Sequence, residues 1–387
     1  MILSGARWFD SNKKLFHNND EILIEDGLIK EIGQKLEKKG QNIIDLSGKL
    51  ITPGWIDSHI HITLSGEKNP IERWQKDGAI LTTIKGVNYL KEYIRAGVTI
   101  VRDLGGDKDI ALGLKQAINE GLIEGPALYT AGRPLTMTGG HIYQIGQEVD
   151  GVALARKGAR KELKKGVDLI KVIATGGILT SGVRYGSPQL TVEEMKAIVE
   201  EAHKADKSVS AHVESKEGII NCLKAGVDTI EHGIGIDHEI MKMMKAHSVI
   251  LIPTLAAPRF ILKHKEQLPD EMVSKAESAV KEHKKSIQIA LKEGCIIAVG
   301  TDAGTPFNYH GGYYNELEEL LNEGIKVEDL LQAMTLNGAK ALGIDSNYGN
   351  IEKGKRATLT IIEDSLDKKD WYKRIDSVIL EGNRIKI

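Results

Sequence analysis

The chain has 387 residues, which is enough for one large domain with a smaller domain attached to it. Its hydrophobic fraction of 41% and charged fraction of 27% are typical of a folded globular protein and exclude a largely disordered one. The formal net charge of −2, without a long block of Lys or Arg, argues against a nucleic-acid-binding surface.

Signals for secretion or membrane insertion are not evident in the sequence. It has no run of about twenty apolar residues, and its first residues lack the basic and apolar pattern of a signal peptide. The two cysteines, Cys222 and Cys295, lie in apolar segments, which argues against a disulfide framework and favours a reducing compartment. We therefore expect a cytoplasmic protein that does not associate with a membrane.

Both ends of the chain have the pattern of short antiparallel strands. Residues 1 to 36 alternate apolar and polar side chains between the turn signals "NND" and "EDG". A similar pattern returns near the C-terminus in "ATLTIIEDS" and "SVILEGNRIKI". We expect β-structure at both ends.

Between the two ends, apolar strands alternate with amphipathic helical segments. One such helix covers residues 191 to 206, where Thr191 and Glu194 form a capping-box pattern. The predicted strands are residues 54 to 62, 97 to 105, 126 to 132, 167 to 174, 208 to 214, 227 to 233, 249 to 254 and 295 to 303. Eight βα units predict an α/β fold of the closed (β/α)8 TIM-barrel type, in which catalytic groups gather at the carboxyl ends of the strands.

Polar side chains interrupt five of these strands near their carboxyl ends. In the first strand, "GWIDSHIHI", the histidines at 59 and 61 share one face because alternate side chains of a strand point the same way. The full set is His59, His61, Lys171, His212, His232 and Asp302. Burying such groups is costly unless they pair or bind a metal ion, so their convergence predicts a metal centre.

Each of these residues also has a simpler structural interpretation. His232 could be a hydrogen-bonded core histidine, Lys171 could pair with Glu231 or Asp168, and Asp302 could cap the following helix. Four other histidines lie in charged helical segments, and we expect them at the surface: His203, His247, His264 and His283. The sequence leaves open the environment of His17, His238 and His310.

Several motifs together resemble the amidohydrolase superfamily over nearly the whole chain. They are "GWIDSHIH", "LIKVIATGG", "AHVES", "TIEHG" and "VGTDAGTP", in this order. "AGVTIVRDLGG" and "TGGH" are most similar to the branch of Xaa-Pro dipeptidases and imidazolonepropionase-like hydrolases. The resemblance implies that residues 1–52 plus 348–387 form a composite β-sandwich domain beside a catalytic barrel of residues 53–347.

The resemblance further implies a centre with two divalent metal ions. His59, His61 and Asp302 would hold the more buried ion, and His212 and His232 the more exposed one. Zinc suits a histidine-rich site best, with manganese or cobalt as alternatives.

Lys171 would bridge the two ions as a CO2-derived carbamate, because an ammonium group cannot bind a cation whereas a carbamate offers two anionic oxygens. Two cations that share a water keep hydroxide available near pH 7. Asp302 would move the proton to the leaving amine, and His141 in "TMTGGH" would steady the carbonyl oxygen unless it is an exposed loop histidine. The implied reaction is hydrolysis of a C–N amide bond in a small molecule by metal-activated hydroxide.

One residue departs from the pattern of the dipeptidase-like branch. There, the second residue after the strand-five histidine is often a tyrosine that receives the α-carboxylate of the substrate, but this chain has Glu214. Arg184 and Tyr185 could take over that function, or Glu214 could select a cationic or neutral amide, or simply act as a capping acid. The expected substrate is a small-molecule amide, with a dipeptide or an N-acyl amino acid as the leading candidates.

Two other functions are compatible with the sequence. A mononuclear deaminase or cyclic-amide hydrolase resembling imidazolonepropionase would use one metal ion and an unmodified Lys171. A non-catalytic scaffold homologue is the other alternative, although the presence of all six candidate ligands argues against it. Homo-oligomers are common among the proteins that the chain resembles, so a homo-oligomer is one possible assembly.

Overall fold

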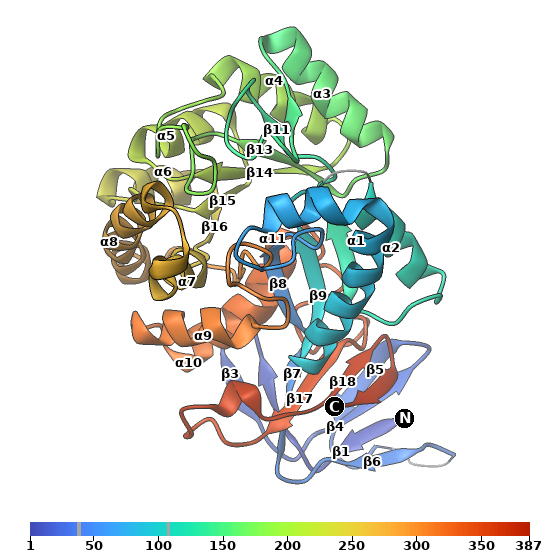
Figure 1. Ribbon diagram of the computed structural model, residues 1–387. Coiled ribbons are helices and arrows are strands. Elements are labelled where there is room, and N and C mark those ends of the chain that lie inside the picture. Colours follow the sequence, from blue (N-terminus) through green and yellow to red (C-terminus); the bar gives the residue numbers. More distant parts are fainter. Residues whose placement is uncertain (37–39, 107–108) are drawn as a thin grey trace.

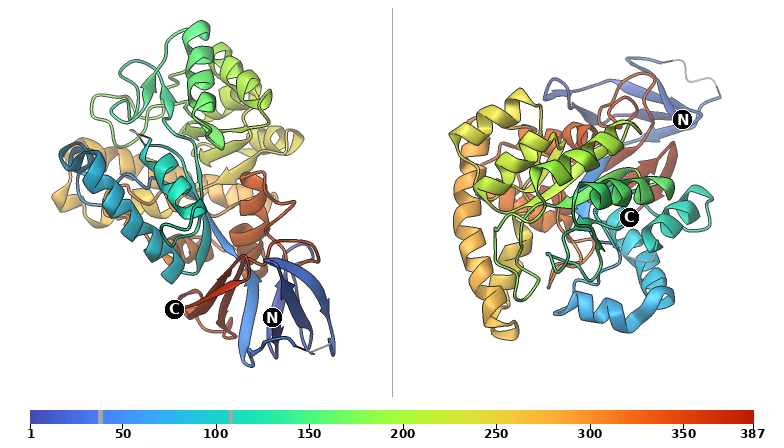
Figure 2. Two further views of the ribbon diagram at one scale, coloured as in Figure 1. Left: turned by 90° about the vertical axis from the view of Figure 1, so that its right-hand side faces the viewer. Right: turned by 90° about the horizontal axis from the view of Figure 1, so that it is seen from above.

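The computed structural model describes residues 1–36, 40–106 and 109–387. Figures 1 and 2 show two regions: parallel strands surrounded by helices, and a region of strands that contains both chain termini. The chain passes from one region to the other where one strand ends at Pro53 and the next begins at Trp55.

Two sheets are built from the ends of the chain. Their strands are β1 (Ile2–Ser4), β2 (Arg7–Asp10), β3 (Leu15–His17), β4 (Glu21–Glu25), β5 (Leu28–Gly33), β6 (Ile43–Asp45), β7 (Lys49–Pro53), β17 (Leu359–Glu363), β18 (Ile375–Leu380) and β19 (Asn383–Lys386). One sheet has the order β5-β4-β1-β6 and the other β19-β18-β17-β7-β2-β3. Antiparallel pairing of β17 with β7 joins the two ends, and Leu3 and Ile22 of one sheet share a buried core with Ile51 and Ile361 of the other.

The central strands are parallel and form two further sheets. They are β8 (Trp55–Ile60), β9 (Val98–Asp103), β10 (Ala127–Thr130), β11 (Leu135–Thr136), β12 (Gln147–Glu148), β13 (Leu169–Ile173), β14 (Ser208–Val213), β15 (Thr229–His232) and β16 (Ile250–Ile252). The orders are β10-β9-β8 and β12-β11-β13-β14-β15-β16. Seven of the eight predicted strand segments therefore contain a strand, whereas the short β11 and β12 were not predicted.

The eighth predicted strand, residues 295 to 303, is not a regular strand. It makes isolated parallel bridges, one from Ile297 to Leu251 and one from Ala303 to Ile60. Its ladder is interrupted because the Asp57 carboxylate accepts the Thr301 backbone N–H at 3.0 Å and the Thr301 hydroxyl at 2.7 Å. This segment still connects β16 to β8.

The helices lie around the central strands (Figure 2). They are α1 (Pro70–Arg95), α2 (Ile110–Asn119), α3 (Val152–Lys164), α4 (Val192–His203), α5 (Lys216–Ala225), α6 (His238–Ala246), α7 (Ala256–Lys263), α8 (Asp270–Lys292), α9 (Tyr313–Asn322), α10 (Val327–Gln332) and α11 (Gly338–Ala341). The predicted capping box of Thr191 and Glu194 is present at the start of α4. None of the helices within the described residues is long and apolar enough to cross a membrane.

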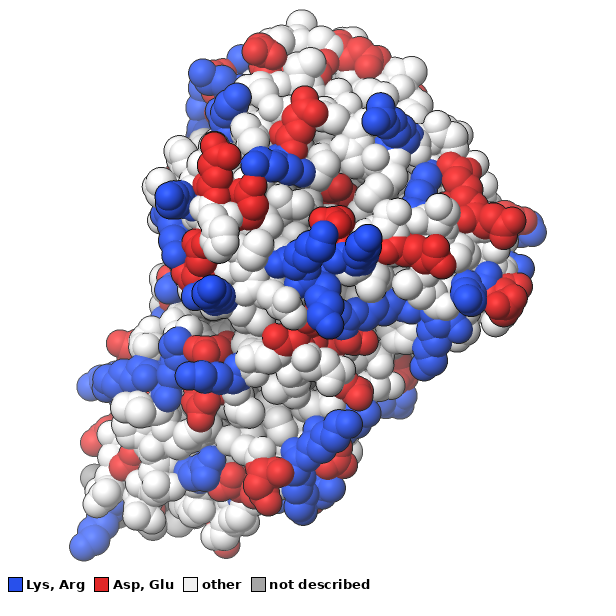
Figure 3. Space-filling view, turned by 90° about the vertical axis from the view of Figure 1, so that its left-hand side faces the viewer, with Lys and Arg blue, Asp and Glu red and all other residues white. Residues whose placement is uncertain are grey.

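Surface charge is mixed on the face shown in Figure 3, where Lys and Arg side chains are interspersed with Asp and Glu. Both signs are present over most of that face, with several Lys and Arg side chains adjoining one another near its middle.

Candidate metal centre and pocket

A first group of potential ligands forms where β8 meets the segment that follows it across the bridge at Ala303. The Nε2 atoms of His59 and His61 lie 3.3 and 3.2 Å from Oδ1 of Asp302, and all three side chains are buried. Nδ1 of His61 lies 2.9 Å from the Gly105 carbonyl, which can only accept, so this nitrogen carries the proton. The Nε2 atom of His61 is then left to face the Asp302 carboxylate, and a neutral ring at this place could share a cation with it.

Glu231 fixes the orientation of His59. One carboxylate oxygen lies 2.8 Å from His59 Nδ1, and the other accepts from Arg102, Ser210 and Thr229 at 2.7 to 2.9 Å. Burial opposes ionisation of Glu231, but Arg102 and His59 outweigh it and hold the pKa of this carboxyl well below its usual range. A carboxylate behind a histidine in this way is the usual support for a metal ligand.

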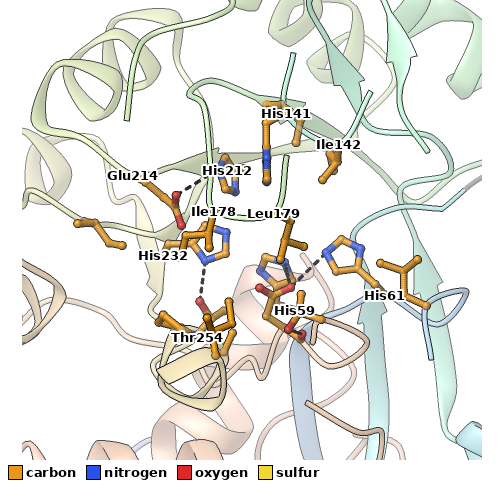
Figure 4. Close-up of a pocket in the computed structure, with 18 of the residues that line it drawn as sticks. His59, His61, His141, Ile142, Ile178, Leu179, His212, Glu214, His232 and Thr254 are labelled. Carbon is orange, nitrogen blue, oxygen red and sulfur yellow. Dashed lines mark hydrogen bonds and ion pairs between the residues drawn. The ribbon is translucent and has the colours of Figure 1, made fainter. Parts of the chain in front are cut away.

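A second group lies at the ends of the next strands, with His212 on β14, His232 on β15 and Glu214 just after β14 (Figure 4). The Thr254 hydroxyl donates to the Pro253 carbonyl at 2.7 Å and therefore accepts from His232 Nδ1 at 2.6 Å. The Nε2 lone pair of His232 is thus free. Burial lowers the pKa of both histidines well below 6.5, so the rings are neutral at pH 7, the form that binds metals.

The two groups are adjacent. The ring centroids of His59 and His232 are 5.2 Å apart, and those of His212 and His232 are 4.6 Å apart. Among the described residues, neither Nε2 of His212 nor Oδ1 of Asp302 has a hydrogen-bond partner. Buried hydrogen-bond acceptors that lie close together and have no donor fit a site for divalent cations.

Lys171, on β13, lies within the same pocket and is 1% exposed. Its Nζ atom has no hydrogen-bond partner in the described part of the chain, and burial lowers the pKa of the amine to about 8. The unprotonated amine, which is the form that reacts with CO2, is therefore accessible near neutral pH. The alternative pairing with Asp168 is wrong, because Asp168 pairs with Lys115 at 2.5 Å.

The site contains residues with strained backbone angles, which also occur elsewhere in the chain. Three residues with large side chains have left-handed backbone angles, with φ of 65° at His232, 52° at Thr254 and 57° at Asp302. Such conformations cost free energy and persist where the surrounding structure enforces them, often at functional sites.

His141 lies in the loop between β11 and β12, where its ring stacks on that of His212 with 4.6 Å between centroids. It is 4% exposed, so the alternative of a loop histidine open to water is wrong. Burial lowers the pKa of His141 to about 3, which leaves a neutral ring. The side chain can donate one hydrogen bond into the pocket.

The rest of the pocket wall is mostly apolar. Its aliphatic members include Leu64, Ile142, Ile145, Ile178, Leu179 and Ile261. Glu214 is one of its few polar members: burial, with a contribution from Asp302, raises the pKa of its carboxyl to about 8. Tyr185 is half-buried and Arg184 is exposed, and neither lines the pocket.

His283 corrects the expectation that it lies at the surface. It is 3% exposed and lines the pocket from α8. Its helix buries small residues at 276, 279, 286 and 290 on the same face, a spacing that could have indicated a buried histidine. His203 and His247 are exposed as expected, and His264 is half-buried and stacks on Phe307.

The remaining histidines have distinct surroundings. His310 is buried, with Nε2 2.7 Å from the Leu64 carbonyl and Nδ1 2.8 Å from the Tyr93 hydroxyl. His17 stacks on Trp8, and His238 pairs with Glu293. None of the three lines the pocket.

Known proteins share this arrangement of sequence and fold. The Amidohydrolase family profile matches residues 50–385. The chain belongs to the amidohydrolase family. It is 27% identical over 382 residues to the ochratoxinase of Aspergillus niger, covering 90% of this chain and 78% of that protein. It is 25% identical over 423 residues to the imidazolonepropionase of Clostridium tetani, covering 97% of this chain and 92% of that protein.

A crystal structure of a Xaa-Pro dipeptidase with bound methionine in the active site superposes with a TM-score of 0.90 and 27% identity, covering 100% of this chain and 99% of that one. The resemblance to the superfamily and to this branch is confirmed. The likeness implies a TIM barrel with an accompanying sheet domain. As an amidohydrolase, the protein is a hydrolase that acts on C–N bonds in small molecules, in a family that generally uses divalent metal ions.

Proposed function

We propose that this amidohydrolase is a binuclear metalloenzyme that hydrolyses a small-molecule amide. One observation carries the proposal. Two adjacent groups of buried side chains point lone pairs toward one another, and no hydrogen-bond donor among the described residues satisfies them. In this proposal His59, His61 and Asp302 hold one ion, and His212 and His232 hold the other.

The proposed ligand set includes Lys171, which as a carbamate would offer an oxygen to each of the two ions. Its buried, unpartnered amine supports this role. When bound, two divalent ions, with zinc as the favoured metal, would polarise a carbonyl and acidify a water molecule.

The side chains of the chain itself would handle the proton and the developing charge. Burial opposes ionisation of Asp302, but His59 and His61 outweigh it and hold its pKa well below the usual range, so a carboxylate base is present at pH 7. It would accept a proton from the attacking water and return it to the leaving nitrogen. Neutral His141 would donate a hydrogen bond to the carbonyl oxygen, and the aliphatic wall would exclude water.

Metal analysis tests the binuclear centre. We expect about two zinc ions per chain after loading, loss of amide hydrolysis on chelation, and recovery on adding metal back. The Lys171→Ala variant should lose at least one ion and the carbamate carbon signal that 13C-bicarbonate gives in NMR spectra of the parent protein. Less than one ion per chain, with hydrolysis unaffected by chelation, would contradict the proposal.

A second candidate is a mononuclear cyclic-amide hydrolase or deaminase, which the similarity to an imidazolonepropionase favours. It predicts one metal ion, an unmodified Lys171, and a Lys171→Ala variant with unchanged metal content. A non-catalytic scaffold is the weaker alternative, since every candidate ligand is present.

Several finer points belong to the same proposal. A dipeptide or an N-acyl amino acid is the substrate class that similarity suggests, because a structural neighbour is a Xaa-Pro dipeptidase. The division into residues 1–52 plus 348–387 and residues 53–347 is supported by the passage from β7 to β8 at Gly54. A cytoplasmic location and a homo-oligomeric assembly stay predictions.

A further inference from the structure

Few charged side chains line the pocket. Among the described residues that line it, Lys171, Glu214 and Asp302 are the only ones of the Asp, Glu, Lys and Arg types. The proposed function uses Lys171 and Asp302 as metal ligands. Glu214 is therefore the one carboxyl group of the pocket lining left to meet a substrate, and Arg184, which could have met a carboxylate, is exposed outside the pocket.

The position of Glu214 is well defined. Its backbone N–H donates to the Thr175 hydroxyl at 3.0 Å, and its side chain is only 5% exposed. Oε2 lies 3.9 Å from His212 Nε2 and has no hydrogen-bond partner among the described residues. Figure 4 shows the carboxylate directed toward His212, with Ile178 nearby.

The surroundings favour one ligand charge over the other. A buried acceptor without a donor is satisfied by a ligand that brings N–H groups, and a cationic ligand also stabilises the ionised form of the carboxyl in a medium of low dielectric constant. A ligand carboxylate at the same place would meet a second acceptor in a pocket whose lining is mostly aliphatic. The nearby ammonium group of Lys275 is already engaged by Glu271 and by the Thr180 carbonyl.

From this arrangement we infer that Glu214 is a specificity-determining residue that selects amides bearing an ammonium, guanidinium or neutral N–H group and rejects amides bearing a carboxylate. The inference rests on the proposed function for the claim that an amide bond is cleaved. The preference of the pocket for one ligand charge does not depend on that claim. It places N-substituted aliphatic amides and amine-bearing amides ahead of free dipeptides and N-acyl amino acids as substrates.

Direct binding to the zinc-loaded protein tests the charge preference without requiring turnover. The probes share a hexyl chain and differ in charge: hexylguanidinium, 1-hexanol and hexanesulfonate, measured by isothermal titration calorimetry. We expect hexylguanidinium to bind at least tenfold more tightly than hexanesulfonate. Equal or tighter binding of hexanesulfonate would overturn the inference from the parent protein alone.

The Glu214→Gln variant tests whether Glu214 causes the charge preference of ligand binding. It should lose at least tenfold in affinity for hexylguanidinium and keep its affinity for 1-hexanol and its zinc content. The matched control is Glu277→Gln, which changes an exposed carboxylate of α8 and should bind all three probes like the parent. Loss of zinc in Glu214→Gln would make Glu214 a metal ligand and overturn its role in selection.

Hydrolysis assays separate this inference from the proposed function. N-hexanoyl derivatives of glycine, glycinamide and ethylenediamine present a carboxylate, a neutral amide and an ammonium on the amine side. N-hexylsuccinamic acid, N-hexylsuccinamide and N-hexyl-β-alaninamide present them on the acyl side. We expect kcat/KM at least tenfold lower for the carboxylate member of a hydrolysed series. Faster turnover of that member would refute the inference, whereas absent hydrolysis of all six, with the binding preference intact, would count against the proposed function alone.

Discussion

Thr254 controls which nitrogen of His232 is available, because its hydroxyl donates to Pro253 and must accept from Nδ1. The Thr254→Val variant keeps the shape of the side chain but leaves that N–H unsatisfied. We expect zinc affinity to fall by about 10-fold to 100-fold, as for other supports of metal ligands. Competition with a chromophoric chelator measures the change.

Thr82→Val is the control for this substitution. Thr82 is also buried, but its hydroxyl donates to the Gly78 carbonyl within α1, away from the pocket lining. This variant should bind zinc like the parent protein. Equal zinc affinity in Thr254→Val would show that Thr254 does not set the tautomer of His232.

The sequence predicted the candidate metal ligands better than it predicted the residues that orient those ligands through hydrogen bonds. His59 and His61 are evident from their alternation on a strand, and the polar residues that end the other strands point to the same rim. Arg102 could also have been noticed in the sequence, because it is a charged residue inside the apolar stretch "VTIVRDLG". Its pairing with Glu231 could not, because the two residues lie on strands that are far apart in the chain. The role of Thr254 depends on the direction of one hydroxyl, which residue types alone do not determine.

At the scale of elements, residues 178–182 form a strap over the pocket that is tied at both sides. The Thr180 hydroxyl accepts from the Ile142 backbone N–H at 2.9 Å. On α8, Glu271 accepts from Ser181 and Gly182, and Lys275 donates to the Thr180 carbonyl. The strap supplies Ile178 and Leu179 to the pocket wall.

Glu271→Ala should loosen this strap without unfolding the protein, since the residue itself is exposed. We expect amide hydrogen exchange of residues 178–184 to rise about tenfold, because local opening governs exchange in such segments. Mass spectrometry of deuterated peptides measures it. Glu277→Ala on the same helix is the control, and unchanged exchange in Glu271→Ala would show that its contacts do not hold the strap.

Elements whose geometry depends on tertiary contacts were the ones mispredicted. Residues 295 to 303 have the apolar composition of a strand, but the Asp57 carboxylate replaces part of the ladder and Asp302 turns to positive φ. His283 sits among Lys and Glu residues in the sequence, and only the small residues on its face indicate burial.

Glu316 makes the contact between the start of α7 and α9 sensitive to pH. Its two carboxylate oxygens accept from the backbone N–H groups of Leu255 and Ala256, each at 2.8 Å. Burial raises the pKa of Glu316 to about 8 from its ordinary value of 4.5. The folded state therefore holds this proton more tightly than the unfolded state, and the resulting stability is present at low pH and lost as pH rises toward 8.

The expected contribution of Glu316 is a fall in the free energy of unfolding of the metal-free protein between pH 5 and pH 8. Glu316 contributes a slope of at most about 1.4 kcal/mol per pH unit. Urea titrations of both proteins across that range measure this contribution as the difference between their slopes, because the glutamine in Glu316→Gln does not titrate whereas the other buried groups are the same in both. The same slope in both proteins would assign the pH dependence to other groups.

At the scale of the whole molecule, the sheet from the chain ends is joined to the central strands through buried contacts. The Thr360 hydroxyl donates to the Gly97 carbonyl at 2.8 Å and accepts from the Trp55 N–H at 3.2 Å. Trp55 packs against Tyr313 and edge-on against Trp371, with centroids 6.1 and 6.2 Å away. These contacts connect a barrel strand, an outer helix and the C-terminal segment.

Because the two regions share this buried cluster, we expect them to unfold together. Trp371→Ala should lower the free energy of unfolding by about 3 to 5 kcal/mol, the usual effect of deleting a buried aromatic side chain. Far-UV circular dichroism follows mainly the helices of the barrel region, and tryptophan fluorescence of the variant reports on Trp8 in the sheet from the chain ends as well as on Trp55 and Trp74. Both midpoints in urea should shift by the same amount, whereas Leu122→Ala, which truncates a side chain that is 71% exposed, should change neither. A fluorescence midpoint that moves while the helical signal stays in place would show that the sheet from the chain ends unfolds on its own.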